Sequence, residues 1–143
     1  MVRGVQDEAA FQAGINNLVT ANGVLRLLRM IADGRAYSPE VCAQMLEIML
    51  DTRAKSGIPA GVPGDASVAH KTGNISTVHH DAGIVYIGNR RPYFLVVLTQ
   101  FPAEAGRTTA VAEVSHGIFE TLGRLKRDVE EAEAEAPAEV VAK

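Results

Sequence analysis

The tripeptide Lys71-Thr72-Gly73 has residue types that could act on a substrate. A lysine ammonium attracts a carboxylate and makes nearby hydroxyls more acidic, and a threonine hydroxyl can donate a hydrogen bond to the same carboxylate. Glycine lets a ligand lie close to the backbone, and the following N–H, on Asn74, could stabilise an oxyanion during acyl transfer. Three residues alone are weak evidence, because lysine and threonine are common and glycine often ends a strand.

The elements around the tripeptide predict where it lies. Three segments have the composition of strands, and a tight turn at residues 88–91 joins the last two into a hairpin. These segments are Ser67–Thr72, His80–Ile87 and Pro92–Gln100. The tripeptide is therefore expected on a third antiparallel strand. At an edge beside a cleft, such a strand could hold an extended substrate as one more strand.

Helices are predicted before and after these strands. Thr20 is a candidate N-cap for a helix that Gly34 ends, and Ser38 with Pro39 begins a second. A short helix is expected near Asp7–Ala13, and Lys55–Asp65 is a glycine- and proline-rich loop. The expected apolar faces are Val24, Leu27, Leu28 and Ile31 in the first helix, Cys42, Met45, Leu46, Met49 and Leu50 in the second, and Val111, Val114, Ile118, Leu122 and Leu125 in a long C-terminal helix.

The segment Pro92–Gln100 does not suit its expected position. It reads PYFLVVLTQ and is apolar on both faces, as in an interior strand that is covered on both sides. In a three-stranded sheet of this order it would lie at an edge, where a long apolar strand invites pairing with another chain. The sequence therefore predicts that something else belongs beside it.

Composition excludes several classes of function. The 143 residues are 47% hydrophobic and 22% charged, with a formal charge of −3, which is ordinary for one globular domain. Six acidic residues and one lysine follow position 127, leaving thirteen basic against eleven acidic residues before it. No basic stripe for nucleic acid, no membrane-spanning apolar run and no signal-peptide pattern is present, and the single Cys42 cannot form an internal disulfide. We expect a domain at 1–127 and an acidic, low-complexity tail at 128–143.

The region from Asn16 to Gly123 resembles the C-terminal part of class A serine β-lactamases and their penicillin-binding relatives. The agreement follows chain order over roughly a hundred residues. It comprises Asn17-Leu18-Val19-Thr20-Ala21, Ile58-Pro59-Ala60-Gly61, His70-Lys71-Thr72-Gly73, Asp81-Ala82-Gly83-Ile84-Val85-Tyr86 and Arg91-Pro92-Tyr93-Phe94-Leu95-Val96-Val97-Leu98-Thr99. The resemblance implies an α+β fold, in which the antiparallel sheet packs with a long C-terminal helix and two helices come from the family's all-α region.

The resemblance also implies roles at the matching positions. Lys71 would be the electrostatic anchor and possible proton-relay partner of the nucleophilic serine. Thr72 would bind the substrate carboxylate, Gly73 would give clearance, and the N–H of Asn74 would be one of two oxyanion-hole donors. The implied substrate is a β-lactam or an acyl-D-Ala-D-Ala-like compound, and no cofactor is expected.

The sequence departs from the family where the nucleophile belongs. Family catalysis begins with Ser-x-x-Lys. No serine here has a lysine at that spacing, and no Ser-Asp-Asn occurs; the serines are Ser38, Ser56, Ser67, Ser76 and Ser115. Glu8 lies in roughly the region of the deacylating glutamate, but its context does not match. The strand Asp81–Tyr86 also lacks an arginine that could help hold the carboxylate.

Three interpretations follow. In the first, the chain is the C-terminal part of a serine β-lactamase-like hydrolase, with its first half absent or on another chain, and it is inactive alone. In the second, it is a non-catalytic binding module that self-associates through Pro92–Gln100. In the third, it is the remnant of a penicillin-binding transpeptidase or carboxypeptidase. The family is usually exported, but the sequence does not establish a location.

The four histidines do not predict a metal site. A His-His pair in a strand directs its side chains to opposite faces, so His79 and His80 cannot easily bind one ion. We therefore interpret His70, His79, His80 and His116 as structural or surface residues.

Overall fold

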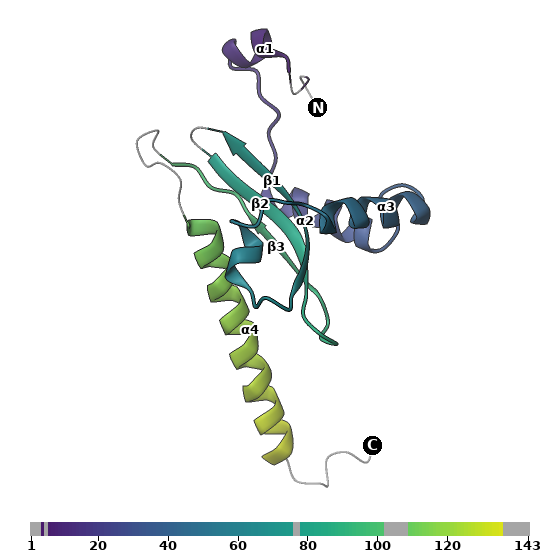
Figure 1. Ribbon diagram of the computed structural model, residues 1–143, viewed down its shortest axis with the longest axis vertical. Coiled ribbons are helices and arrows are strands. Elements are labelled where there is room, and N and C mark those ends of the chain that lie inside the picture. Colours follow the sequence, from purple (N-terminus) through teal and green to yellow (C-terminus); the bar gives the residue numbers. More distant parts are fainter. Residues whose placement is uncertain (1–3, 5, 76–77, 102–108, 136–143) are drawn as a thin grey trace.

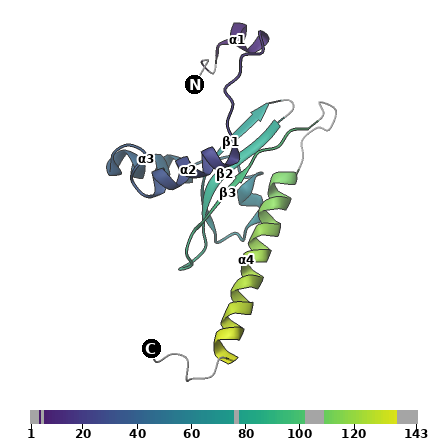
Figure 2. The same ribbon diagram turned by 180° about the vertical axis from the view of Figure 1, so that it is seen from behind.

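The computed structural model describes residues 4, 6–75, 78–101 and 109–135. A three-stranded antiparallel sheet of order β1-β2-β3 lies at its centre (Figure 1). Helix α4 and the short 3-10 helix η1 lie on one side of the sheet, and α2 and α3 lie on the other, as Figure 2 also shows. The elements are α1 (Glu8–Gln12), α2 (Ala21–Ala32), α3 (Pro39–Leu50), η1 (Ile58–Gly61), β1 (Ser67–Ile75), β2 (Val78–Tyr86), β3 (Tyr93–Val97) and α4 (Ala110–Glu135). The predicted α+β architecture is confirmed.

The helix boundaries follow the predicted capping residues. The Thr20 side chain accepts a hydrogen bond from the N–H of Gly23 at 3.1 Å, and Ser38 accepts one from Val41 at 3.3 Å. Both hydroxyls satisfy backbone donors that have no partner within the helix. Gly34 follows α2 with φ of +70°, a conformation that glycine adopts without steric cost. Sequence reasoning therefore located both helices correctly.

The strand register fixes which residues share a face of the sheet. Lys71 is paired with Ala82, Thr72 with Asp81 and Gly73 with His80, and β2 then pairs Ala82 with Val96. Side chains alternate along a strand, so Lys71, Gly73, His80 and Ala82 share one face. The strands differ from the predicted bounds, since β1 continues to Ile75, β2 begins already at Val78, and β3 is shorter than Pro92–Gln100.

The apolar core lies between the sheet, η1 and the start of α4. Its members are Ile58, Val68, Val85, Val97 and Val111. Ile58, Val85 and Val111 have no exposed surface. Burial of this size stabilises a protein by roughly 1.5–3 kcal/mol for each large aliphatic side chain. The core therefore holds η1 and α4 to one face of the sheet.

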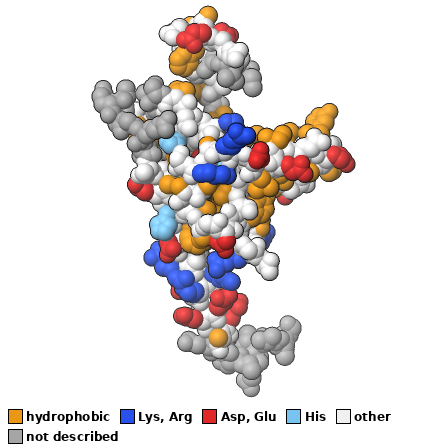
Figure 3. Space-filling model, viewed as in Figure 1, with side chains coloured by type: hydrophobic (Ala, Val, Ile, Leu, Met, Phe, Trp, Pro, Cys, Tyr) orange, Lys and Arg blue, Asp and Glu red, His pale blue; other side chains and the backbone are white. Residues whose placement is uncertain are grey.

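Several predicted core residues are exposed instead. In α4 only Val111 of the expected stripe is buried, while Val114, Ile118, Leu122 and Leu125 are 38–55% exposed. In α2 Leu27 is 52% exposed, and in α3 Leu50 is 41% exposed. Figure 3 shows hydrophobic side chains gathered on the side of the molecule where α2 and α3 lie. The amphipathic pattern was read correctly, but the described residues do not cover these faces.

Two further expectations concern the ends of the chain. Helix α4 continues through position 128 to Glu135, so no helix end marks the expected boundary between 127 and 128. Part of the expected tail, residues 136–143, lies outside the described residues.

Over the part that is described, no helix combines the length and the apolar character that crossing a bilayer requires.

Candidate active-site wall

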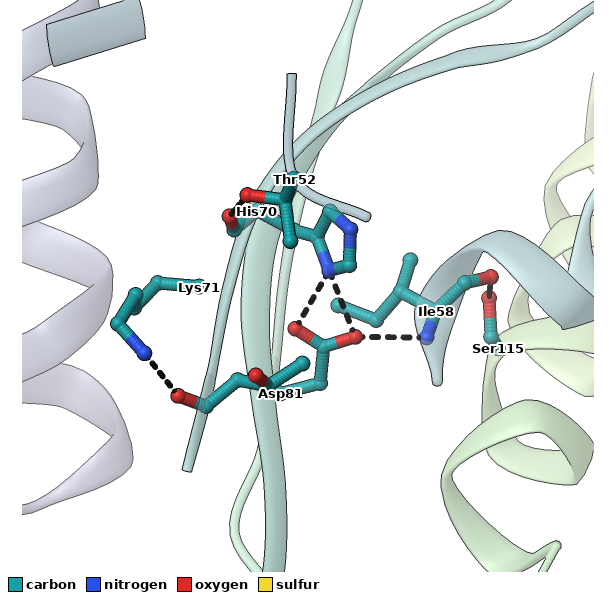
Figure 4. A network of polar contacts seen from close by, with 7 residues as sticks. Thr52, Ile58, His70, Lys71, Asp81 and Ser115 are labelled. Carbon is teal, nitrogen blue, oxygen red and sulfur yellow. Dashed lines mark hydrogen bonds and ion pairs between the residues drawn. The ribbon is translucent and has the colours of Figure 1, made fainter. Parts of the chain in front are cut away.

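The Lys-Thr-Gly strand lies at an edge of the sheet. β1 is paired with β2 alone among the described strands, and Lys71, Gly73 and Asn74 are exposed. The Lys71 ammonium donates to the carbonyl of Thr72 at 2.5 Å, so its charge lies along the strand and outside the core (Figure 4). An extended substrate can lie beside Lys71-Thr72-Gly73 only if this edge of the strand is exposed.

A groove of about 460 Å³ runs between this edge and the helices α2 and α3. Lys71, Thr72 and Gly73 line it from β1, and His80, Asp81 and Ala82 line it from β2. The opposite wall is apolar: it comprises Val24, Leu27, Leu28 and Ile31 from α2 and Met45, Ile48 and Met49 from α3, with Leu98 completing the lining. Lys71 is the one lysine or arginine among the described lining residues, so its charge faces a wall of apolar side chains from α2 and α3.

Behind this wall, a polar network fills the opposite side of the strands. His70 Nδ1 lies 2.9 Å from Asp81 Oδ1 and 3.0 Å from Oδ2, and both side chains are fully buried. Asp81 Oδ2 also accepts the N–H of Ile58 at 2.8 Å. Ser115 of α4 donates to the carbonyl of Ile58 at 2.9 Å (Figure 4). The network therefore connects β1 and β2 to η1 and α4.

His80 has a fixed ring orientation in the groove. The N–H of Thr99 donates to His80 Nδ1 at 3.0 Å, so this nitrogen is the acceptor. Burial, together with the neighbouring His79, lowers the pKa of His80 below its ordinary value. His80 faces the groove while His70 faces η1, and no described group of three His, Cys, Asp or Glu side chains is arranged to hold a metal ion.

The other candidate residues lie away from the groove. Figure 1 shows α1, which carries Glu8, beyond the end of the sheet, and Glu8 accepts a hydrogen bond from Gln12 at 2.6 Å. Ser38 caps α3 and Ser115 bonds to Ile58, so both hydroxyls have structural partners. Among the described residues no serine lines the groove, and Ser76 lies outside the described residues. Asn74 lies on β1 opposite His79.

A comparison with known protein families identifies the family of this chain. A model described as the β-lactamase enzyme family matches residues 2–122. The chain belongs to the β-lactamase enzyme family. A search of curated proteins found no match.

Solved structures of PBP-A and of β-lactamases are similar to the chain. PBP-A is 26% identical with a TM-score of 0.66, and the match covers 82% of this chain and 50% of PBP-A. A β-lactamase from Chitinophaga pinensis is also 26% identical, with a TM-score of 0.69 and coverage of 80% and 46%. A class A representative from Bacteroides cellulosilyticus is 22% identical, with a TM-score of 0.71 and coverage of 83% and 47%. This β-lactamase-family chain thus spans about half the length of these proteins.

Sequence reasoning missed the His70–Asp81 pair. The two residues are not directly opposite, since His70 is paired with Gly83 and Asp81 with Thr72. They are diagonal neighbours on one face, a relation that only the strand register reveals. A histidine and an aspartate placed on the same face of adjacent predicted strands, with a glycine opposite the histidine, could have indicated the pair.

Proposed function

We propose that this chain supplies the carboxylate-binding wall of a serine β-lactamase-like active site. The observation that carries the proposal is the position of Lys71: it is exposed on a strand that, among the described strands, is paired on one side only, and with Thr72 it lines the groove. An exposed ammonium attracts the carboxylate of a β-lactam, and the adjacent hydroxyl can donate to it. The family and a mutant of PBP-A solved as an acyl-enzyme complex with penicillin G support this class of substrate.

Each residue of the wall has a distinct part in the proposed chemistry. Lys71 attracts the substrate anion and favours ionisation of an attacking hydroxyl placed near it. Gly73 leaves room for the acyl donor, and the N–H of Asn74 stabilises the oxyanion that forms when the carbonyl is attacked. The attacking hydroxyl belongs to a residue outside this sequence, because no serine here has the Ser-x-x-Lys spacing. Acylation of that serine and then hydrolysis would complete the reaction.

A binding experiment tests the wall directly. Penicillin G is titrated into the ¹⁵N-labelled chain, and the amide signals of residues 71–74 are followed by NMR. We expect saturable shifts, with an affinity at least tenfold weaker in Lys71→Met, because a hydrogen bond to a charged group contributes about 1.5–3 kcal/mol. Lys55→Met is the matched control, since Lys55 is also exposed but lies outside the groove. Equal affinity in the two variants would contradict the proposal.

The chain by itself is expected not to turn over substrate. A chromogenic β-lactam incubated with the pure protein should hydrolyse at its spontaneous rate. Hydrolysis above this rate that survives further purification and scales with protein concentration would show that the nucleophile is present after all.

A second candidate function is self-association through β3. Among the described strands β3 is paired with β2 alone, and it consists of Tyr93, Phe94, Leu95, Val96 and Val97. A free apolar edge can pair with a second copy. Sedimentation at several concentrations would then show a dimer that Val96→Lys abolishes. A monomer at every concentration would exclude this function.

A further inference from the structure

The buried His70–Asp81 pair lies directly behind the proposed binding wall. His70 precedes Lys71 in β1, and Asp81 is the cross-strand partner of Thr72. Neither side chain has exposed surface, and His70 Nε2 is buried without a partner among the described residues. The interaction therefore depends on Nδ1, which must carry a proton to donate to the carboxylate.

Two glycines make room for the pair. A Cβ on Gly57 would lie 2.2 Å from Asp81 Oδ2, and a Cβ on Gly83 would lie 2.7 Å from His70 Cβ. Both distances are shorter than any side chain tolerates, so each member of the pair occupies space that a glycine leaves free. The backbone before η1, at Gly57, and the backbone of β2, at Gly83, therefore pack closely against the pair.

Hydrogen bonds from other elements fix both members. The Thr52 hydroxyl donates to the His70 carbonyl at 2.9 Å, and the N–H of Ile58 donates to Asp81 at 2.8 Å. Ser115 then joins Ile58 to α4 at 2.9 Å. The edge strand β1 is therefore attached, through side chains, to the loop after α3, to η1 and to α4.

A buried ionisable pair is a costly way to fill space. Well-packed apolar residues of similar volume are often as stabilising or more so, whereas a directional pair specifies one arrangement. A contact that specifies one arrangement matters most in β1, because an edge strand has one neighbouring strand to set its register. A slip of one residue would exchange the two faces, turning Lys71 into the core and His70 toward the groove.

We propose that His70 and Asp81 are positioning residues, which lock the register of β1 and thereby hold the Lys71 side chain on the groove face of the sheet. The bond between Nδ1 and the carboxylate forms only in the observed register. The significance of this lock for substrate binding rests on the proposed function, but the lock itself can be tested without a substrate.

Two substitutions of His70 separate positioning from general stability. His70→Asn places an amide N–H near the position of Nδ1, whereas His70→Gln places its amide nearer Nε2. The two variants have the same polarity but differ in reaching Asp81. Ser115→Ala is the control, since it removes a buried hydrogen bond of the same network without touching β1.

The first measurement is amide hydrogen exchange at residues 71–73, divided by exchange in the β2–β3 ladder. This ratio corrects for changes in global stability. We expect His70→Gln to raise the ratio at least tenfold, and His70→Asn and Ser115→Ala to stay within threefold of the wild type. Equal ratios in the Gln and Asn variants would overturn the proposal.

A second measurement needs no variant. The ¹⁵N and ¹H signals of the wild-type His70 ring report which nitrogen is protonated, and we expect the proton on Nδ1. An unprotonated Nδ1 would overturn the proposal, even if a variant failed to fold.

Penicillin G binding by the same proteins distinguishes the two proposals. If Lys71→Met and His70→Gln both weaken binding by about tenfold and His70→Asn does not, the His70–Asp81 contact is needed to position Lys71 for binding. If Lys71→Met has no effect, the proposed function fails, while the exchange ratio still decides on the lock. If Lys71→Met weakens binding and His70→Gln changes neither binding nor the ratio, the lock fails alone.

Discussion

The two faces of the β1–β2 pair differ in how completely they are filled. On the side of η1 and α4, His70 and Asp81 are fully buried and bonded to each other. On the side of α2 and α3, Lys71 and Gly73 are exposed and border an open groove. Alternation along a single strand therefore places a structural residue beside a candidate binding residue. Adjacent positions should respond very differently to substitution.

The largest expected difference is between Asp81→Ala and Lys71→Ala. Removing Asp81 leaves His70 and the N–H of Ile58 without their buried acceptor, and breaking a buried pair costs about 3–5 kcal/mol. Lys71→Ala should change the free energy of unfolding by less than about 0.5 kcal/mol, as exposed substitutions usually do. Urea denaturation of the two variants measures both values. Similar losses would show that the two faces are not distinct.

A smaller difference is expected between two glycines. Gly57→Ala would bring a methyl group against the Asp81 carboxylate, and overpacking of this kind costs about 1–3 kcal/mol. At Gly73 the nearest atoms to an added Cβ belong to His80, at 3.7 and 3.9 Å, which is ordinary contact. Gly73→Ala should therefore leave the unfolding midpoint nearly unchanged. A stability loss at Gly73 as large as at Gly57 would contradict the openness of the groove face.

The smallest expected effect is a pH dependence from the groove side. The folded protein lowers the pKa of His80 below its unfolded value of about 6.5, so the unfolded chain binds this proton more readily. The stability associated with neutral His80 is therefore present above about pH 6.5 and declines as the pH falls below it. His80→Asn keeps an acceptor for the N–H of Thr99 but does not titrate. The fall in melting temperature from pH 7.5 to 5.5 should be smaller in this variant. An equal or larger fall would show that His80 does not contribute.

The sequence predicted the elements because their signals are local. Thr20 and Ser38 cap helices through bonds to residues three positions away, and the strands follow from short apolar segments. The edge position of Lys71 also followed, since a strand that precedes a hairpin lies at an edge of the sheet whichever hairpin strand it pairs with, and here it pairs with β2. Burial was harder to predict, because it depends on what covers each apolar face. Leu27 and Leu122 suit a core by pattern but are exposed.

The polar network could not be predicted in the same way. His70 meets Asp81 only because the register places them diagonally. Ser115 joins this network by bonding to Ile58, which is 57 residues earlier in the sequence. Such contacts depend on tertiary structure that no short segment encodes. The sequence analysis interpreted His70 as a structural or surface residue. Its complete burial shows that it is structural.

The length of α4 has a consequence for how the molecule melts. Its 26 residues span about 39 Å, and Figure 1 shows its final turns beyond the end of the sheet. There the helix is supported by its own backbone bonds and by an exposed ion pair between Lys126 and Glu130, whose charged atoms lie 3.2 Å apart. Warming should therefore unwind this end while the strands remain intact, so loss of helical signal begins before cooperative unfolding.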